Sequence, residues 1–330
     1  MAIASAAEVR RLPRLAVIDV LRGVAIVAMV VYHAGFDLSY QGLIAVDVST
    51  HPLWVALARI TASTFLIIAG VSMVLSTRNG INWESYLRRL GVIVASAALV
   101  SLVTWLVFGP AFVFFGILHQ IALASVLALP FLRLPAIVTL LAAAAILVIP
   151  ALYASQFFDT PALWWVGLST FVPETVDYVP VFPWFGMVLA GIAIGELLVV
   201  PAGVGVLGHW RPANPVTKAL AVAGRWSLAI YLVHQVVLFG LSEAAVAARN
   251  LLVPAPAVEL APRTRFVGEC LPSCTANPAV DAATCEARCG CVFDRLQQTD
   301  FSRVPYDSMT ADQRTRFQSI VNACITGPKP

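Results

Sequence analysis

Residues 18–38 of the chain read IDVLRGVAIVAMVVYHAGFDL. This stretch is mostly apolar, and a membrane-spanning helix needs about 20 such residues. The whole chain is similarly apolar: 59% of its residues are hydrophobic, 12% are charged, and the mean hydropathy is +0.85. Soluble domains carry about 25% charged residues. Because too few polar groups are present to cover the surface in water, the sequence predicts a polytopic membrane protein.

Seven segments are long and apolar enough to cross a bilayer. They are residues 15–36, 53–76, 87–108, 111–131, 135–153, 181–200 and 218–241. Helix breakers such as Gly109-Pro110 separate them. A weak segment at 243–260, interrupted by charges and prolines, leaves eight spans as the alternative. The predicted fold is an all-α transmembrane helix bundle of about seven spans, followed by a small extramembrane domain.

The charges of the loops orient these spans. Lys and Arg lie before the first span and in the second, fourth and sixth loops, whereas the loops at 37–52 and 154–180 contain none. Cytoplasmic loops of membrane proteins are enriched in Lys and Arg. The N-terminus is therefore predicted in the cytoplasm. With seven spans the C-terminus is predicted outside, which is the periplasm if the cell is Gram-negative.

Residues 251–330 are predicted to form a second domain after a membrane domain of residues 1–250. This tail contains all six cysteines, namely Cys270, Cys274, Cys285, Cys289, Cys291 and Cys324. An even number of cysteines in a small external segment is typical of a fold held by disulfides. The sequence does not choose among the pairings. Zinc is the alternative, but the spacings are not those of common zinc modules and the tail has no His.

Ionisable residues within a span mark candidate functional sites, because each costs at least about 2.5 kcal/mol at the centre of the bilayer. The first span carries Asp19, Arg22, His33 and Asp37. At about 100° per residue these four side chains share one stripe of the helix. Arg22 is expected towards the inner face, and His33 towards the outer face, about 16 Å away along the axis. The alternative is that Asp19 and Arg22 are interfacial and that Asp37 simply lies in the following loop, which explains Arg22 less well and His33 hardly at all.

Two further spans carry imidazoles at a similar depth. The fourth holds His119 and Gln120, and the seventh holds His234 and Gln235. A lone buried histidine is usually structural, but three on different helices favour a shared polar cavity.

Other residues are expected around this bundle. Arg59 and Trp184 are predicted to line it, and His51 lies at the outer mouth of the second span as a secondary candidate. His209 is expected to be a cytoplasmic loop residue.

These residue types suit the transfer of a group across the membrane. A histidine near the outer face can act as general base on an acceptor hydroxyl or amine. An arginine near the inner face can bind the phosphate of a cytosolic donor. No metal site is expected, since His33 and Asp37 provide only two ligands. The chain also lacks a Walker loop and a dinucleotide fingerprint, and no nucleic-acid partner is predicted.

Five runs resemble the bacterial members of the heparan-alpha-glucosaminide N-acetyltransferase catalytic-domain family. They are IDVLRGVAIVAMVVYHAGFDL, TFLIIAGVSMVLS, FGILHQIAL, VFPWFGMVLAGIAIG and GRWSLAIYLVHQ, in this order. Arg22 and His33 also resemble the Arg-x10-His pattern of the acyltransferase-3 group, which implies His33 in acyl transfer and Arg22 in a structural or donor-binding role. In the lysosomal member of the family the catalytic histidine follows the corresponding span, so the resemblance implies His51 as the alternative to His33.

The resemblance implies an acyltransferase that uses cytosolic acetyl-CoA and acetylates a glucosamine-type sugar or glycan outside. The expected catalytic residues are His33, Arg22, Asp37, His119 and His234. The expected donor-binding residues are Arg22, Arg59, Arg88, Arg89, Gln120, Trp184 and Gln235. No tightly bound cofactor is predicted, membrane lipid is an expected partner, and an oligomer is compatible with the sequence. Direct transfer and an acetyl-histidine intermediate both stay open. The rival functions are a proton-coupled transporter or exporter, and a membrane scaffold or sensor.

Overall fold

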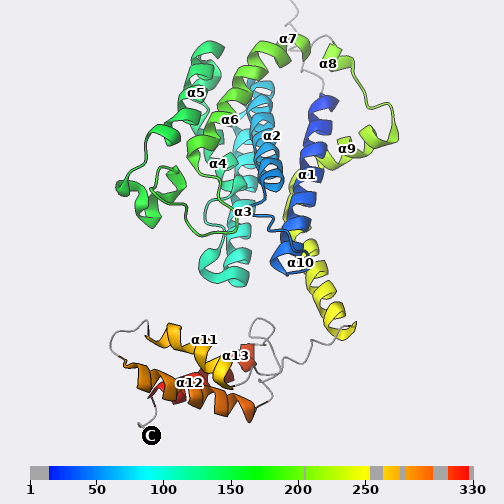
Figure 1. The fold of residues 1–330 in the computed structure, drawn as a ribbon. Helices are drawn as coiled ribbons and strands as arrows, with labels where there is room; N and C mark the ends of the chain where they lie inside the picture. Colours follow the sequence, from blue (N-terminus) through cyan, green and yellow to red (C-terminus); the bar gives the residue numbers. More distant parts are fainter. Residues whose placement is uncertain (1–14, 204–205, 253–262, 276–279, 300–310, 327–330) are drawn as a thin grey trace, which may run out of the picture. The chain divides into compact units, whose positions relative to one another are not determined.

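The computed structural model describes residues 15–203, 206–252, 263–275, 280–299 and 311–326, and every regular element within these ranges is a helix (Figure 1). The chain divides into two units, Met1–Glu243 and Ala244–Pro330. The predicted all-α membrane bundle is confirmed.

Within the residues that the structure describes, five helices are long and apolar enough to cross a membrane. They are α1 (Ala16–Tyr40), α2 (Pro52–Thr77), α3 (Trp83–Phe108), α6 (Val181–Ile194, continued by the π-helical turn Gly195–Val199) and α10 (Ser227–Leu252). The fourth and fifth predicted spans are shorter apolar helices, α4 (Ile117–Leu127) and α5 (Ala136–Leu152). Many large apolar side chains of the helices named here face outward, including that of Leu106 on α3, which is 70% exposed. Such a surface suits contact with lipid rather than water.

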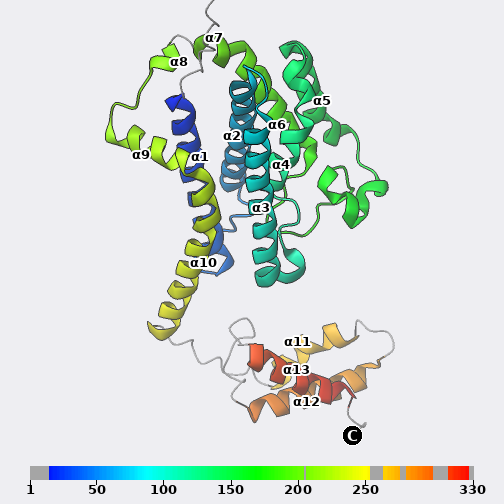
Figure 2. The same ribbon diagram turned by 180° about the vertical axis from the view of Figure 1, so that it is seen from behind.

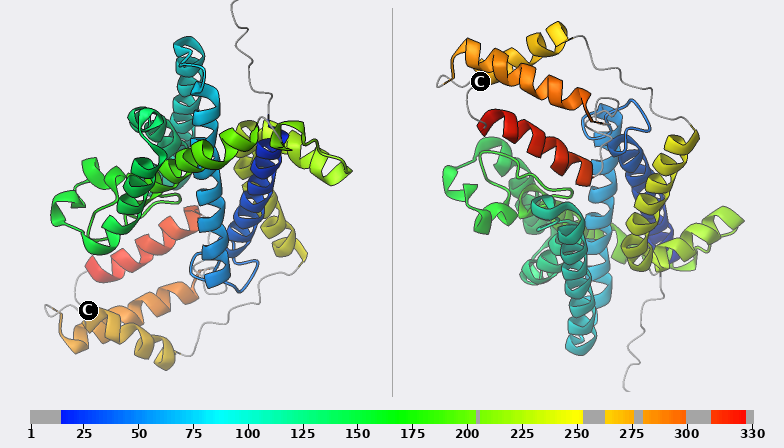
Figure 3. Two further views of the ribbon diagram at one scale, coloured as in Figure 1. Left: turned by 90° about the horizontal axis from the view of Figure 1, so that it is seen from above. Right: turned by 90° about the horizontal axis from the view of Figure 1, so that it is seen from below.

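The core of the first unit lies between α2, α5 and α6. Leu66, Leu189 and Ile192 are fully buried there. α2 also packs against α1, and Figure 3, which looks along the bundle, shows α1, α9 and α10 on one side of α2. The helices of the candidate site therefore stand around α2.

The fourth span is shorter than the predicted range 111–131 because its first part is not helical. A 3-10 turn at Gly109–Ala111 ends α3, and the chain then runs extended to Gly116. This segment pairs with the strand-like residues before α6: the Val176 amide donates to the Ala111 carbonyl over 3.0 Å, and Phe115 and Tyr178 form an isolated bridge. Irregular backbone at membrane depth is tolerated where it is buried in protein or lines a cavity.

The seventh span begins later than the predicted residue 218. Residues Pro215–Arg225 form a separate helix, α9, which ends at Trp226 before α10 starts. α9 crosses α1 closely (Figures 1 and 2). A Cβ atom at Gly23 would overlap the Leu220 carbonyl, and one at Gly224 would overlap the Asp19 carbonyl. The two glycines therefore allow this contact.

The second unit contains α11 (Arg263–Thr275), α12 (Ala282–Gln297) and α13 (Ala311–Thr326). Its disulfides pair Cys270 with Cys289, Cys274 with Cys285, and Cys291 with Cys324. The first two are nested and fasten α11 to α12, and the third fastens α13 to α12. Disulfides are thus confirmed over zinc, and no cysteine in the described residues is free.

Candidate active site

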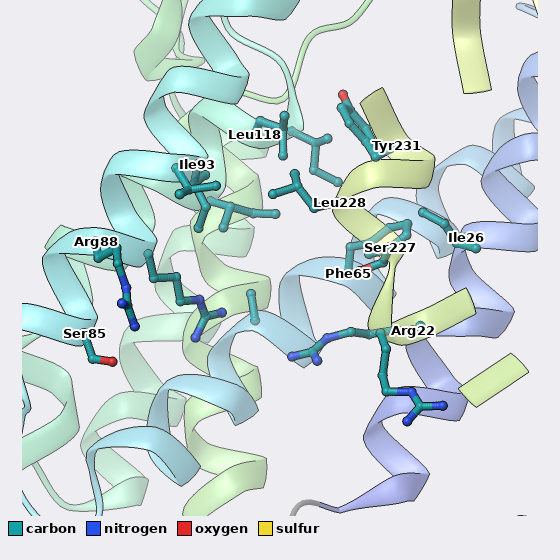
Figure 4. A pocket seen from close by; sticks show the side chains of 17 residues that line it. Arg22, Ile26, Phe65, Ser85, Arg88, Ile93, Leu118, Ser227, Leu228 and Tyr231 are labelled. Atoms are coloured by element: carbon teal, nitrogen blue, oxygen red, sulfur yellow. The ribbon is translucent and has the colours of Figure 1, made fainter. Parts of the chain in front are cut away.

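A cavity of about 640 Å³ opens between α1, α2, α3, α4, α9 and α10. Four arginines line it, namely Arg22, Arg88, Arg89 and Arg225, and we refer to it as the basic cavity. In Figure 4 the side chains of Arg22 and Arg88 lie towards one end of this cavity, whereas Tyr231 and Leu118 lie towards the other. Four guanidinium groups around one space are suited to an anionic ligand, because a guanidinium can donate paired hydrogen bonds to phosphate oxygens.

Arg22 is held in the wall of the basic cavity by two neighbours. Its Nη2 donates a hydrogen bond of 2.6 Å to Ser72 Oγ on α2, and its Nη1 lies 3.7 Å from the buried Asp19 carboxylate. The position predicted for Arg22, near the start of the first span, is where the structure places it.

A second cavity, of about 250 Å³, is lined by His33, Arg59, Asp177 and Trp184. We refer to it as the histidine cavity. Its walls come from α1, α2, the start of α4, α6, α10 and the segment before α6.

The two cavities share part of their lining. Phe65, Ile117 and Tyr231 line both, and we call these three residues the shared wall. The two cavities are therefore neighbours, with the four arginines in one lining and His33 in the other. A small group carried along the basic cavity would therefore arrive beside the histidine cavity.

His33 contacts a second histidine. The ring centroids of His33 and His234 are 5.0 Å apart. His234 Nδ1 lies 2.7 Å from the Tyr231 carbonyl, which can only accept, so Nδ1 carries a proton and Nε2 of the neutral ring is left as an acceptor. Within the described residues His234 Nε2 is buried and has no hydrogen-bond partner. The structure thus brings together two of the predicted histidines.

Asp37 and Gln235 form a pair one turn beyond these histidines. Gln235 Nε2 donates to Asp37 Oδ1 over 2.8 Å, and Asp37 is only 2% exposed. Asp37 Oδ2 and Gln235 Oε1 are buried and have no hydrogen-bond partner among the described residues. Neither residue lines the two cavities, so the pair joins α1 to α10 beside the site.

His119 and Gln120 lie apart from both cavities. His119 Nδ1 accepts from the Gly116 amide at 3.2 Å, so its Nε2 carries the proton and donates to Ser101 Oγ at 3.1 Å. Both ring nitrogens therefore fix the start of α4. Gln120 is fully buried in the core.

The remaining predicted residues are spread around the bundle. His51 precedes α2, and its Nδ1 is buried without a hydrogen-bond partner in the described part of the chain, but it lines neither cavity. Arg59 and Trp184, expected to bind the donor, line the histidine cavity instead of the basic one. His209 ends the short helix α8 (Val206–His209).

Asp177 is a residue of the site that the sequence does not single out. Its Oδ2 accepts from the Ile117 amide over 3.2 Å at the start of α4, and a Cβ at Gly116 would overlap this carboxylate. Burial raises the pKa of Asp177 to about 6, although the bond from Ile117 opposes the rise. Because its partner is 60 residues away in sequence, no local spacing indicates this role.

The sequence likewise does not single out Arg225 and Tyr231. Both lie in the run GRWSLAIYLVHQ, where the sequence draws attention to His234 and Gln235. Their function as lining residues depends on the break between α9 and α10, which hydropathy does not reveal.

Comparison with known proteins agrees with this geometry. The family described as heparan-alpha-glucosaminide N-acetyltransferase, catalytic, matches residues 14–236, which include every residue that lines the two cavities. No curated protein and no solved structure was found to match the chain. The match extends over more than half of the 330 residues and over the whole candidate site. The chain therefore belongs to the heparan-alpha-glucosaminide N-acetyltransferase catalytic family.

Proposed function

We propose that the protein transfers an acetyl group from cytosolic acetyl-CoA to a sugar or glycan acceptor in the periplasm, of the glucosamine type. The observation that carries this proposal is the meeting of the basic cavity and the histidine cavity at Phe65, Ile117 and Tyr231. A donor held on one side and an acceptor held on the other reach a common point there. Membership of an acetyltransferase family supports the same reaction.

The basic cavity suits the donor. Its volume of about 640 Å³ is in the range of small-molecule sites. Arg88, Arg89 and Arg225 are exposed, so the phosphates of CoA can bind near solvent while the thinner acyl-carrying arm points towards the shared wall. Arg22, fixed by Ser72, completes the set of cations.

The histidine cavity suits the acceptor. His33 lines it and is placed to remove a proton from an acceptor amine or hydroxyl. Asp177 and Arg59 offer charged groups that can orient polar substituents of a sugar, and Trp184 offers an apolar ring face. His234, in contact with His33, keeps the imidazole in position.

Two routes are compatible with this arrangement. In the first, His33 acts as base while the acceptor attacks the thioester directly. In the second, His33 takes the acetyl group and then passes it to the acceptor. Both routes require the acetyl group to reach the shared wall.

A proton-coupled transporter is the second candidate. It is favoured by Asp37 Oδ2 and His234 Nε2, which are buried and have no hydrogen-bond partner among the described residues, since buried ionisable groups also mark proton paths. Substrate flux into proteoliposomes in the absence of any acyl donor would support it.

The proposal is tested with the purified full-length protein in detergent, by acetyl-CoA binding and CoA release. Loss of a charge-assisted contact is worth about 1.5–3 kcal/mol, so Arg22→Ala should weaken acetyl-CoA binding about 10- to 100-fold. His33→Ala should retain binding and lose about 10²- to 10⁴-fold in turnover, as expected for removal of a general base.

Matched controls come from residues outside both cavities. Arg133→Ala and His209→Ala change the same residue types at exposed positions and should leave binding and turnover unchanged. Absence of acetyl-CoA binding by the folded wild-type protein would overturn the acetyltransferase proposal, and unchanged turnover of His33→Ala would remove His33 from it.

A further inference from the structure

Tyr231 occupies a special place in the shared wall. Of the three residues that line both cavities, Phe65 and Ile117 have no polar hydrogen in their side chains, and Tyr231 has a hydroxyl. Arg59 and Tyr32, which also carry donors, line only the histidine cavity. Within the described lining, Tyr231 is thus the side chain that can donate a hydrogen bond where the two cavities meet.

The hydroxyl of Tyr231 is not used by the fold. Other tyrosine hydroxyls are engaged: Tyr86 donates to the Ser125 carbonyl, and Tyr178 donates to the Trp164 carbonyl. Tyr231 is partly buried, yet its hydroxyl has no hydrogen bond to any described residue. In Figure 4 this hydroxyl points away from the arginine end of the basic cavity.

The contacts of Tyr231 hold it next to the histidines. Its carbonyl accepts the hydrogen bond from His234 Nδ1, and its ring lies 5.7 Å from the His234 ring, centroid to centroid. His234 in turn contacts His33. A group stopped at the shared wall therefore meets the Tyr231 hydroxyl while its other side faces the cavity of His33.

We propose that the Tyr231 hydroxyl donates a hydrogen bond to the thioester carbonyl oxygen of the acyl donor and stabilises the oxyanion formed during transfer. This inference rests on the proposed function. The attacking nitrogen or oxygen of the acceptor forms a bond to the carbonyl carbon, its proton passes to His33, and the C=O electron pair moves onto the oxygen. When the carbonyl re-forms, the C–S bond breaks and CoA leaves as a thiolate; His33 gives up the proton it took, and the thiolate regains it through solvent.

The same donor serves the two-step route. The nucleophile is then the His33 imidazole, and the carbonyl oxygen bears the same charge in the first transfer. Donors aimed at a developing oxyanion act most strongly where water is excluded, and Phe65 and Ile117 place apolar side chains beside Tyr231 in both linings. Removing one such donor typically lowers kcat by about 10²- to 10³-fold.

The test compares wild type, Tyr231→Phe and the control Tyr40→Phe, which removes a hydroxyl from an exposed residue that lines neither cavity. Isotope-edited infrared difference spectra are recorded with acetyl-CoA labelled with ¹³C at the carbonyl. We expect the carbonyl band to move to lower wavenumber on binding to wild type and Tyr40→Phe, and to stay near its free position in Tyr231→Phe. Tyr231→Phe should also lose about 10²- to 10³-fold in kcat with its Kd for acetyl-CoA unchanged.

The outcomes separate this inference from the proposed function. Two results would overturn the role of Tyr231 alone. In the first, wild type binds acetyl-CoA normally but the infrared carbonyl band does not shift. In the second, the band shifts in Tyr231→Phe as much as in wild type. No binding by wild type overturns the proposed function and the inference together. If Tyr231→Phe does not fold, the wild type is assayed with a donor whose carbonyl oxygen is replaced by sulfur, a poor acceptor. The replacement lowers the rate of the enzymatic reaction and of the uncatalysed reaction by factors that can be compared. If the enzymatic rate falls by no larger a factor than the uncatalysed rate, the inference is overturned.

Discussion

Asp177 lies where burial makes the ionised form of its carboxyl group unfavourable. It is surrounded by protein at the start of α4, and its described hydrogen bond comes from a single amide, that of Ile117. The raised pKa of about 6 expresses this cost, because burial disfavours the ionised form. Asp177 thus combines a structural contact at the start of α4 with a place in the lining of the histidine cavity, and a buried carboxyl group with a shifted pKa in a cavity is a candidate for contact with a substrate.

Asp177→Asn should therefore change how stability depends on pH. In the wild type, the folded state holds the proton up to about pH 6, whereas the unfolded chain loses it near the ordinary value of 3.8. Stability from this group is thus present at pH 4 and is lost as pH rises to 6, by up to about 3 kcal/mol. Asn keeps an acceptor for the Ile117 amide and never ionises. We expect the variant to match wild type near pH 4 and to have the higher Tm at pH 8, measured by thermal unfolding in detergent. A Tm difference that does not vary with pH would contradict the shifted pKa.

Several residues of the site could be predicted from the sequence, and others could not. Arg22, His33, Arg88 and Arg89 stand out because charge and imidazole are rare in apolar spans, and the structure places all four in the cavities. Their roles stay predictions. Asp177 resembles any acidic loop residue, since its importance comes from a contact with α4 made only in the folded chain.

Among the elements, α9 links the fold to the basic cavity. It is fastened to α1 by the glycine contacts at Gly23 and Gly224, and it brings Arg225 to the cavity. Hydropathy predicts one continuous span over 218–241, because the apolar residues of α9 and α10 follow each other without a strong breaker. The separation of the two helices depends on packing of α9 against α1, which no sequence window contains. Likewise, the shortened fourth span depends on pairing between residues 109–116 and 175–179.

Gly23→Ala should loosen α9. The added methyl group would overlap the Leu220 carbonyl, and such overpacking costs about 1–3 kcal/mol. We expect a lower Tm and, because Arg225 shifts with α9, weaker acetyl-CoA binding. Gly91→Ala is the matched control, since a Cβ there meets no atom within 4 Å. In α3 it should be neutral or stabilising by up to about 1 kcal/mol. Equal behaviour of the two variants would show that the contact between α1 and α9 is unimportant.

At the scale of the whole molecule, the chain joins an apolar bundle to a unit that depends on disulfides. The described helices of that unit bury few apolar side chains, among them Val267, Phe293 and Leu296. Small units of this kind need covalent links. The sequence predicts the links from cysteine number and expected compartment, but their pairing follows from the positions of α11, α12 and α13.

The three disulfides should stabilise different parts of the second unit. Replacing Cys291 and Cys324 by Ser releases α13 while the nested pair still joins α11 to α12. Loss of one native disulfide typically costs about 2–4 kcal/mol. We expect trypsin to cleave faster at Arg314 and Arg316 in α13, with acetyl-CoA binding unchanged because the cavities belong to the first unit. Uniformly faster cleavage across α11 and α12 would mean that the three helices unfold together.

The predicted orientation is tested by reporter fusions. Alkaline phosphatase folds only after export, so a fusion after residue 330 should be active and one after Leu134, in the fourth loop, should be inactive. An inactive C-terminal fusion would favour eight spans and would leave the cysteines in a reducing compartment, where disulfides are rare.

The shared wall has one more consequence, which concerns the cell rather than the substrate. If acetyl transfer runs across a membrane as proposed, a continuous file of water through the bundle would let protons leak across that membrane. Phe65 and Ile117 place apolar side chains where the two cavities share their lining, and apolar constrictions exclude ions by dewetting. In the proposed reaction only a neutral acetyl group passes these side chains. The shared wall would then act as electrical insulation as well as the place where the two substrates meet.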